Sequence, residues 1–147
     1  MCLICERIKN LKKNPHFIHE FKHSIFVLGD HQFFQGYSLL FFKEHVRDVT
    51  ELSPEVAGEF FKEVVSAGKI IQKHFQPYRL NYSCLGNQVE HIHFHIFPRY
   101  TQDLEQSSKS SPWFFSNQFN DHLINADQAI QISKEIKKGF SHGNMAE

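Results

Sequence analysis

Apolar residues cluster in short runs before residue 50 and again after residue 78, which is typical of β-strands. Between these runs lies a longer stretch in which apolar residues recur at helical spacing. The pattern predicts strands at residues 17–20, 24–28, 37–43, 79–85 and 89–99, and a short helix within residues 3–13. We therefore expect an α+β domain with a mostly antiparallel sheet of about five strands.

Two helices are predicted after the third strand. Ser53 is a suitable N-cap, Pro54 suits the first helical position, and Pro77 ends a long central helix over residues 54–75. A C-terminal helix is predicted from a cap at Asn125 to about Lys138. Both helices carry apolar residues on one face, so we expect them to pack against the sheet.

Composition narrows the class of protein. The 147 residues suit one domain, and the 16 basic residues equal the 16 acidic ones. A balanced charge argues against bulk binding of nucleic acid. The N-terminus resembles neither a secretory signal nor a membrane span, so no membrane partner is expected. Three cysteines do not suggest a disulfide framework, which favours a cytoplasmic protein.

Three of the 11 histidines alternate with apolar residues between residues 91 and 97. Successive side chains of a strand point to opposite faces, so Ile92, Phe94 and Ile96 are expected to face a core. His91, His93 and His95 would then form a row on the other face. Such a row adds nothing to packing, so it needs a chemical explanation.

Three interpretations of the row compete. It can be a solvated polar face, or a zinc site, because histidines two apart on a strand can bind one metal ion. It can also be a site of nucleophilic catalysis, because a neutral imidazole can attack a phosphoryl group. The preceding Gly86-Asn87-Gln88 favours the last, since a glycine turn with amide side chains offers uncharged donors to phosphate oxygens.

The sequence around the row is similar to a known family. The matching segments are Leu85-Gly86-Asn87, His91-Ile92-His93-Phe94-His95-Ile96-Phe97, Pro98-Arg99-Tyr100, and Gly36 to Val46 followed by Leu52-Ser53. They resemble the histidine-triad (HIT) family, in particular its bacterial diadenosine-tetraphosphate-hydrolase-like branch. The resemblance covers residues 1–100 of a single HIT-like domain, with residues 101–147 as a C-terminal extension.

The resemblance implies roles for individual residues. His93 would be the nucleophile that forms a nucleotidyl-histidine intermediate, which water then resolves. His91 and His95 would complete the catalytic set, with His95 closer to the phosphate and the leaving-group oxygen. The substrate-binding residues are predicted to be Asn87, Gln88, Asp30 and Asn81. Tyr37 departs from the family pattern, because many members have a fourth histidine there.

The family resemblance also bears on a metal and on assembly. Cys2-Leu3-Ile4-Cys5 resembles the family's N-terminal Cys-x-x-Cys, and some members bind a structural zinc through residues that match Cys2, Cys5, His45 and His91. No cofactor is expected to be required for catalysis. A homodimer with a shared, extended sheet is implied. The remaining cysteine, Cys84, is predicted to be an inert thiol in the core.

The resulting hypothesis is an enzyme that cleaves adenosine-type nucleotides, such as dinucleoside polyphosphates, at the α-phosphate. Within this class the alternative is an adenosine phosphoramidate hydrolase. From other classes, the alternatives are a non-catalytic nucleotide-binding or interaction module and a zinc hydrolase. The aromatic run Trp113-Phe114-Phe115 can close over the site, pack in the core or contact a second subunit.

Overall fold

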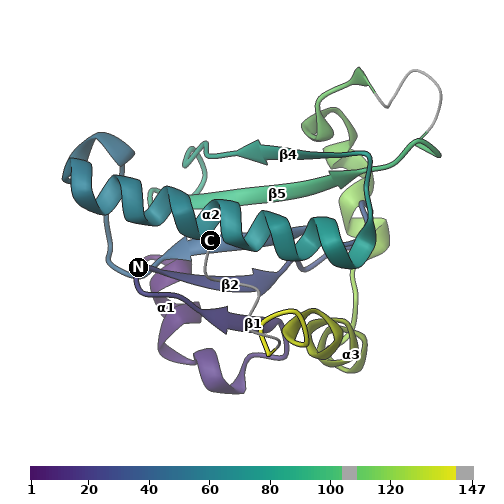
Figure 1. The fold of residues 1–147 in the computed structure, drawn as a ribbon, viewed down its shortest axis with the longest axis horizontal. Helices are drawn as coiled ribbons and strands as arrows, with labels where there is room; N and C mark the ends of the chain where they lie inside the picture. Colours follow the sequence, from purple (N-terminus) through teal and green to yellow (C-terminus); the bar gives the residue numbers. More distant parts are fainter. Residues whose placement is uncertain (104–108, 142–147) are drawn as a thin grey trace.

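The computed structural model describes residues 1–103 and 109–141, so residues 104–108 and 142–147 of the predicted extension lie outside it. The regular elements are α1 (Leu3–Lys9), β1 (Phe17–Glu20), β2 (Ser24–Leu28), β3 (Ser38–Phe42), α2 (Pro54–Phe75), β4 (Arg79–Ser83), β5 (His93–Arg99) and α3 (Ala126–Lys137). Short 3-10 helices lie at Leu11–Lys13 (η1), Val49–Glu51 (η2) and Pro112–His122 (η4). The strands form one antiparallel sheet in the order β1-β2-β3-β5-β4. The predicted α+β fold is confirmed (Figure 1).

The helices begin where the sequence predicts. The Ser53 hydroxyl accepts a hydrogen bond from the Val56 backbone N–H at 3.2 Å, which caps α2. At α3, the Asn125 side chain accepts from the Gln128 N–H, and the Gln128 side chain in turn accepts from the Asn125 N–H. Local cap chemistry therefore fixes the start of both long helices.

The boundaries of three strands differ from the prediction. β3 and β4 are shorter than expected, and β5 begins at His93 rather than Val89. Before β5 the backbone turns, with the His91 N–H donating to the Val89 carbonyl at 2.8 Å. The Ile92 N–H then donates to the Val46 carbonyl, outside the strand ladder. The apolar alternation continues through this turn, which is why sequence pattern alone extends the strand too far.

Each face of the sheet carries its own core. One core joins α2 and α3 to residues such as Phe26, Leu40 and Ile96. The other joins α1 and η4 to Val27, Leu39, Phe41 and Phe97. In Figure 1, α2 lies across one face of the sheet. Because alternate residues of a strand face opposite ways, neighbours along β3 belong to different cores.

The C-terminal segment returns to the sheet. Phe115 and Phe119 of η4 are buried in the second core, and His31 pairs with Leu123 in an isolated bridge. The Ile124 N–H donates to the Asp30 carbonyl at 3.1 Å. The predicted extension is thus an integral part of the domain. In the described part of the chain, no helix is long and apolar enough to span a membrane.

Candidate nucleotide-binding and catalytic site

His93 and His95 lie on the face of β5 that α2 does not cover. In the register of β3 and β5, Phe41 is opposite His93 and Leu39 is opposite His95. All four side chains line one hollow of about 420 Å³. This volume is within the range of small-ligand pockets, which span about 300–1,000 Å³. Ile92 and Ile96 are buried on the opposite face, as predicted.

The His93 ring has a fixed orientation. Its Nδ1 lies 2.6 Å from the His91 carbonyl oxygen, and only a ring N–H can make this hydrogen bond. The Nδ1–H tautomer is therefore favoured, which leaves the lone pair on Nε2. With 9% of its surface exposed, His93 is accessible only from the hollow that it lines.

His95 lies among aromatic rings. Its Nδ1 is 2.7 Å from the Tyr37 hydroxyl, and the edge of its ring meets Trp113 with 4.8 Å between centroids. Burial is the main cause that lowers the pKa of His95 to about 3, and His93 and His31 lower it further. The ring is therefore neutral at physiological pH.

Trp113 forms part of the wall of the hollow. Its indole N–H donates to the Ser83 hydroxyl at 3.0 Å, which ties η4 to β4. Its neighbours in sequence differ: Phe115 is buried in the second core, whereas Phe114 is 76% exposed. Within this aromatic run, Trp113 therefore borders the site, and Phe115 packs in the core.

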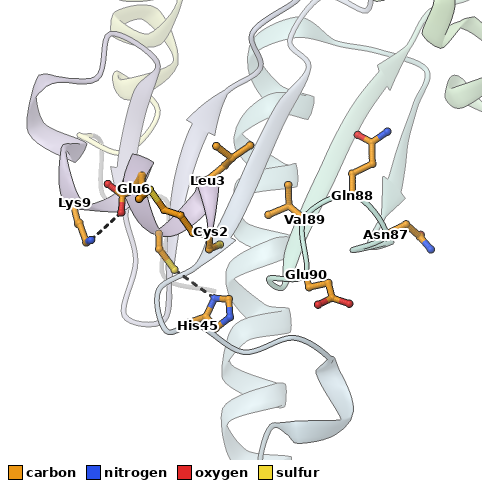
Figure 2. Close-up of a pocket in the computed structure, with 11 residues that line it drawn as sticks. Cys2, Leu3, Glu6, Lys9, His45, Asn87, Gln88, Val89 and Glu90 are labelled. Carbon is orange, nitrogen blue, oxygen red and sulfur yellow. Dashed lines mark hydrogen bonds and ion pairs between the residues drawn. The ribbon is translucent and has the colours of Figure 1, made fainter.

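The predicted amide turn lies at the mouth of the hollow. Gly86 has a φ of 71°, in the left-handed region that favours glycine. Asn87 and Gln88 are exposed and line both this hollow and a second one beside α1. Figure 2 shows that their loop lies across this second hollow from Leu3. Both residues therefore border the site.

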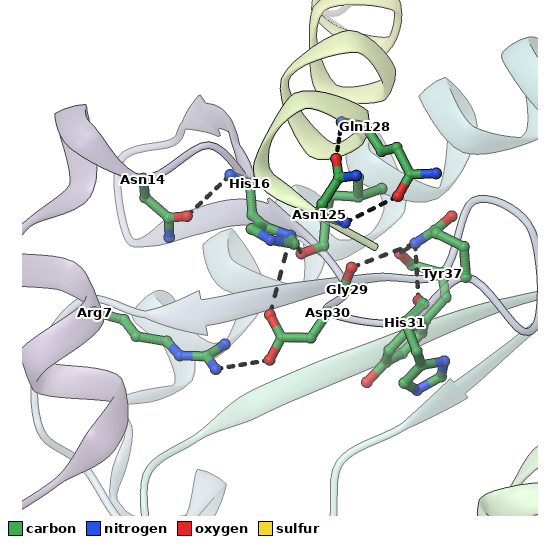
Figure 3. Close-up of polar contacts among 11 residues, drawn as sticks. Arg7, Asn14, His16, Gly29, Asp30, His31, Tyr37, Asn125 and Gln128 are labelled. Atoms are coloured by element: carbon green, nitrogen blue, oxygen red, sulfur yellow. Dashed lines mark hydrogen bonds and ion pairs between the residues drawn. The ribbon is translucent and has the colours of Figure 1, made fainter. Parts of the chain in front are cut away.

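Asp30 is also part of the wall, paired with Arg7 of α1. The guanidinium donates to the Asp30 carboxylate at 2.7 Å, and the His16 ring lies 4.0 Å from its other oxygen (Figure 3). Arg7 was not predicted as a site residue. Its position could have been inferred, because Leu3, Ile4 and Arg7 recur at helical spacing and all three line the hollow.

Asn81 has a different environment from the other predicted substrate-binding residues. Its side-chain oxygen accepts a hydrogen bond from Arg99 at 2.9 Å. Arg99 is itself buried and donates to Asp103 and to the Ser110 carbonyl. Asn81 does not line the hollow that contains His93. The structure therefore gives Asn81 a contact that supports the segment leading to η4.

The four predicted metal ligands come together at the N-terminus of α1. One ligand atom from each of Cys2, Cys5, His45 and His91 lies within 4.8 Å of the other three. His91 Nδ1 is 3.5 Å from both sulfurs, and His45 Nδ1 is 3.4 Å from Cys5 Sγ (Figure 2). A tetrahedral zinc with Zn–S of about 2.3 Å and Zn–N of about 2.0 Å places S and N about 3.5 Å apart. This group fits zinc.

His91 therefore lies in different surroundings from the other two triad histidines. Its Nε2 lies 2.6 Å from the Phe42 carbonyl, so this nitrogen carries the hydrogen and the Nδ1 lone pair faces the sulfurs. It is fully buried and does not line the hollow. His91 precedes β5, so of the three predicted rings only His93 and His95 belong to the strand.

The prediction that Cys84 is a core thiol is wrong. Cys84 follows the last residue of β4 and is exposed. Beyond Ser83 the chain leaves the sheet for the turn at Gly86, so no strand covers the thiol. The sequence prediction failed because it extended β4 to residue 85.

Comparison with known proteins agrees with this architecture. The family model described as the HIT domain matches residues 10–102. Protein Hit of Bacillus subtilis is 32% identical over 88 residues, which are 56% of this chain and 61% of that protein. The chain thus matches less than two thirds of that relative.

Solved structures show the same fold. A hypothetical histidine triad nucleotide-binding protein of Sulfolobus tokodaii has a TM-score of 0.72 and 18% identity, covering 95% of this chain and 92% of that one. A zinc-bound histidine triad family protein of Mycobacterium smegmatis has a TM-score of 0.66 and 20% identity, covering 99% and 97%.

Proposed function

Because the chain belongs to the HIT family, we propose that it cleaves adenosine-type nucleotides at the α-phosphate through a nucleotidyl-histidine on His93. The observation that carries this proposal is the hydrogen bond from His93 Nδ1 to the His91 carbonyl. It directs the only ring lone pair to Nε2, on a side chain that lines a hollow of suitable size. Dinucleoside polyphosphates are the preferred substrate class.

The proposed reaction has two steps. His93 Nε2 forms a bond to the α-phosphorus while the bond from phosphorus to the leaving group breaks, and its electron pair goes to the leaving group. The ring becomes positively charged, and the His91 carbonyl stabilises it by accepting the Nδ1–H. Water then attacks phosphorus while the bond from phosphorus to Nε2 breaks and its electron pair returns to Nε2. The water loses a proton to the medium, which leaves the nucleoside monophosphate and neutral His93.

Uncharged donors are available to the phosphate. Asn87 and Gln88 lie at the mouth of the hollow, and His95 lies beside His93, with 4.9 Å between ring centroids. Fixed donors stabilise the negative charge of the transition state without the cost of reorienting water. Asp30 is proposed to bind the ribose, since its carboxylate lines the same wall and can accept from a hydroxyl.

The test is turnover of diadenosine tetraphosphate and of a fluorescent adenosine phosphoramidate by the wild type and by His93→Ala. We expect His93→Ala to reduce kcat more than about 10³-fold while nucleotide binding remains, because binding rests on other contacts. The ratio of the two wild-type rates decides between the two substrate classes. If His93→Ala keeps a tenth of the wild-type rate, the proposal is wrong, and binding without turnover indicates a non-catalytic module.

A structural zinc is proposed at Cys2, Cys5, His45 and His91. It would tie α1 to the turn before β5 and orient His91, whose carbonyl in turn holds His93. Zinc bound there would supply structure rather than chemistry, because His93 and His95 are not among its ligands. Chelation should therefore lower stability more than it lowers kcat, and loss of turnover in proportion to zinc would favour a zinc hydrolase.

A homodimer is also proposed. β4 is an edge strand, and β4, α2 and the link between them carry exposed apolar side chains. They are Phe61, Val65, Tyr78 and Tyr82. An edge strand beside an apolar surface is suited to pairing with a second copy. Light scattering at micromolar concentration should give twice the monomer mass for the wild type, and a monomer for the wild type would contradict the proposal.

A further inference from the structure

Tyr37, the residue that precedes β3, contacts the last histidine of the triad. Its hydroxyl lies 2.7 Å from His95 Nδ1. The phenol ring stacks with His31 and with Phe97, with centroid distances of 4.4 and 4.5 Å. Only 5% of the residue is exposed. The hydroxyl is therefore held by rigid packing at one particular nitrogen of His95.

The backbone around Tyr37 is built for this position. A Cβ on Gly29 would lie 2.2 Å from the Tyr37 ring, so residue 29 must lack a side chain for the phenol to fit. The Gly29 N–H and the Gln32 side chain both donate to the Tyr37 carbonyl at 2.9 Å. These contacts fix the ring from its backbone side, independently of His95.

The direction of the hydrogen bond follows from the two partners. Burial raises the pKa of the Tyr37 hydroxyl, so it keeps its hydrogen. Among the described residues, the acceptor within hydrogen-bond distance of this hydroxyl is His95 Nδ1. A neutral imidazole has one acceptor nitrogen and one N–H. If Nδ1 accepts from the phenol, the hydrogen of His95 is on Nε2.

We propose that Tyr37 is a positioning residue that holds His95 in the Nε2–H tautomer, so that His95 presents a hydrogen-bond donor to the substrate. This inference rests on the proposed function for its catalytic meaning, although the tautomer itself does not depend on it. His95 then donates to a phosphate or leaving-group oxygen and cannot act as a second nucleophile through Nε2. No proton leaves the ring, so Tyr37 also stays neutral.

The arrangement makes adjacent rings opposite in character. His93 has its hydrogen on Nδ1 and its lone pair on Nε2, because a carbonyl can only accept. His95 has the reverse, because its Nδ1 is the acceptor for the hydrogen of the Tyr37 hydroxyl. Two rings whose centroids are 4.9 Å apart thus serve as a nucleophile and a donor without a charged group at either one.

The test is the ¹⁵N spectrum of the histidine rings at neutral pH in the wild type, in Tyr37→Phe and in Tyr100→Phe. Tyr37→Phe removes one oxygen and keeps the stacked ring. Tyr100→Phe is the matched control, because its hydroxyl donates to the Gln35 carbonyl, not to a triad histidine. We expect wild-type His95 to show the Nε2–H tautomer with a hydrogen-bonded Nδ1. In Tyr37→Phe, the ¹⁵N chemical shift of His95 Nδ1 should move toward the value of a nitrogen that accepts no hydrogen bond.

Kinetics provide the second readout. Tyr37→Phe should lower kcat about 3- to 10-fold, as expected for one lost hydrogen bond, with KM nearly unchanged. An Nδ1–H tautomer in wild-type His95, or a His95 signal that does not change in Tyr37→Phe, would overturn the inference. If the protein turns over no nucleotide, the proposed function fails, and the spectrum still decides whether Tyr37 holds the tautomer.

Discussion

The two ends of the histidine triad differ in what surrounds them. At one end, His91 is fully buried, and its Nδ1 faces the sulfurs of Cys2 and Cys5. At the other end, the Nδ1 of His95 contacts the Tyr37 phenol, within a group of aromatic rings that includes Trp113. The first environment suits a soft metal ion, and the second consists of uncharged aromatic side chains.

The comparison shows how one residue type acquires different chemistry within five positions. Each ring has one nitrogen committed to a fixed partner: a carbonyl for His91, a carbonyl for His93 and a phenol for His95. The partner decides where the hydrogen lies, and so decides what the remaining nitrogen can do. The lone pair of His91 is thus on Nδ1 and faces the cysteine sulfurs. The lone pair of His93 is on Nε2, and His93 lines the hollow.

The strongest test of the aromatic end is His95→Ala. We expect kcat to fall about 10²–10³-fold with little change in KM, because one fixed donor to the developing negative charge is lost. Cys5→Ser, at the opposite end, should change kcat far less. Steady-state kinetics on both variants measure this difference. Equal losses of kcat would show that the two ends do not have separate roles.

The metal end should matter for stability instead. Cys5→Ser should reduce zinc content below a tenth of an equivalent and lower the free energy of unfolding by about 3 kcal/mol or more, because metal binding is coupled to folding. Cys84→Ser is the matched control, since its thiol is exposed and outside the cluster. Elemental analysis and urea unfolding provide the data. A full zinc equivalent in Cys5→Ser would remove this assignment.

The aromatic end should be the source of acid sensitivity that does not depend on metal. His31 stacks with Tyr37 and with Phe119, and burial is the main cause that lowers its pKa to about 4. The unfolded chain takes up this proton near pH 6.5, so stability is fully present above pH 6.5 and is lost as the pH falls toward 4.

His31→Phe keeps a stacked ring and removes the titration. Between pH 7 and 4.5, the wild type should lose about 2 to 3 kcal/mol more of its free energy of unfolding than this variant loses. Denaturant unfolding at several pH values, carried out with chelator present for both proteins, isolates the effect from zinc. Parallel curves for the two proteins would show that His31 is not the group responsible.

The smallest effect is expected at Trp113. Trp113→Phe removes the indole N–H that donates to Ser83 and should raise KM about 3- to 5-fold, near 1 kcal/mol, by loosening one wall of the hollow. Phe114→Ala is the control, because Phe114 is 76% exposed and does not line the hollow. If both variants match the wild type, Trp113 does not shape the site.

Much of the fold could be predicted from sequence because its signals are local. The caps at Ser53 and Asn125 and the alternation along β5 depend on near neighbours only. The turn before β5 could not be predicted, because the Ile92 N–H donates to the Val46 carbonyl, which lies beyond the end of β3 and is distant in sequence. The buried position of His91 follows from that turn.

The candidate site was predicted only in part. The resemblance named the four cysteine and histidine ligands, and the structure brings them together. The resemblance could not reveal the ion pair between Arg7 and Asp30 or the contact between Tyr37 and His95. Both depend on packing between segments that are distant in sequence. Asn81 shows the reverse, since a polar residue near the motif in sequence contacts Arg99 rather than the hollow.

The central claim is that His93 carries the nucleotide covalently. Rapid mixing of the enzyme with diadenosine tetraphosphate, an alkaline quench that preserves the P–N bond, and intact-mass measurement test it directly. We predict a wild-type species heavier by one adenylyl group, located on the peptide that contains His93 and absent from His93→Ala. Turnover by wild-type enzyme without any adduct, or an adduct that persists in His93→Ala, would contradict the account.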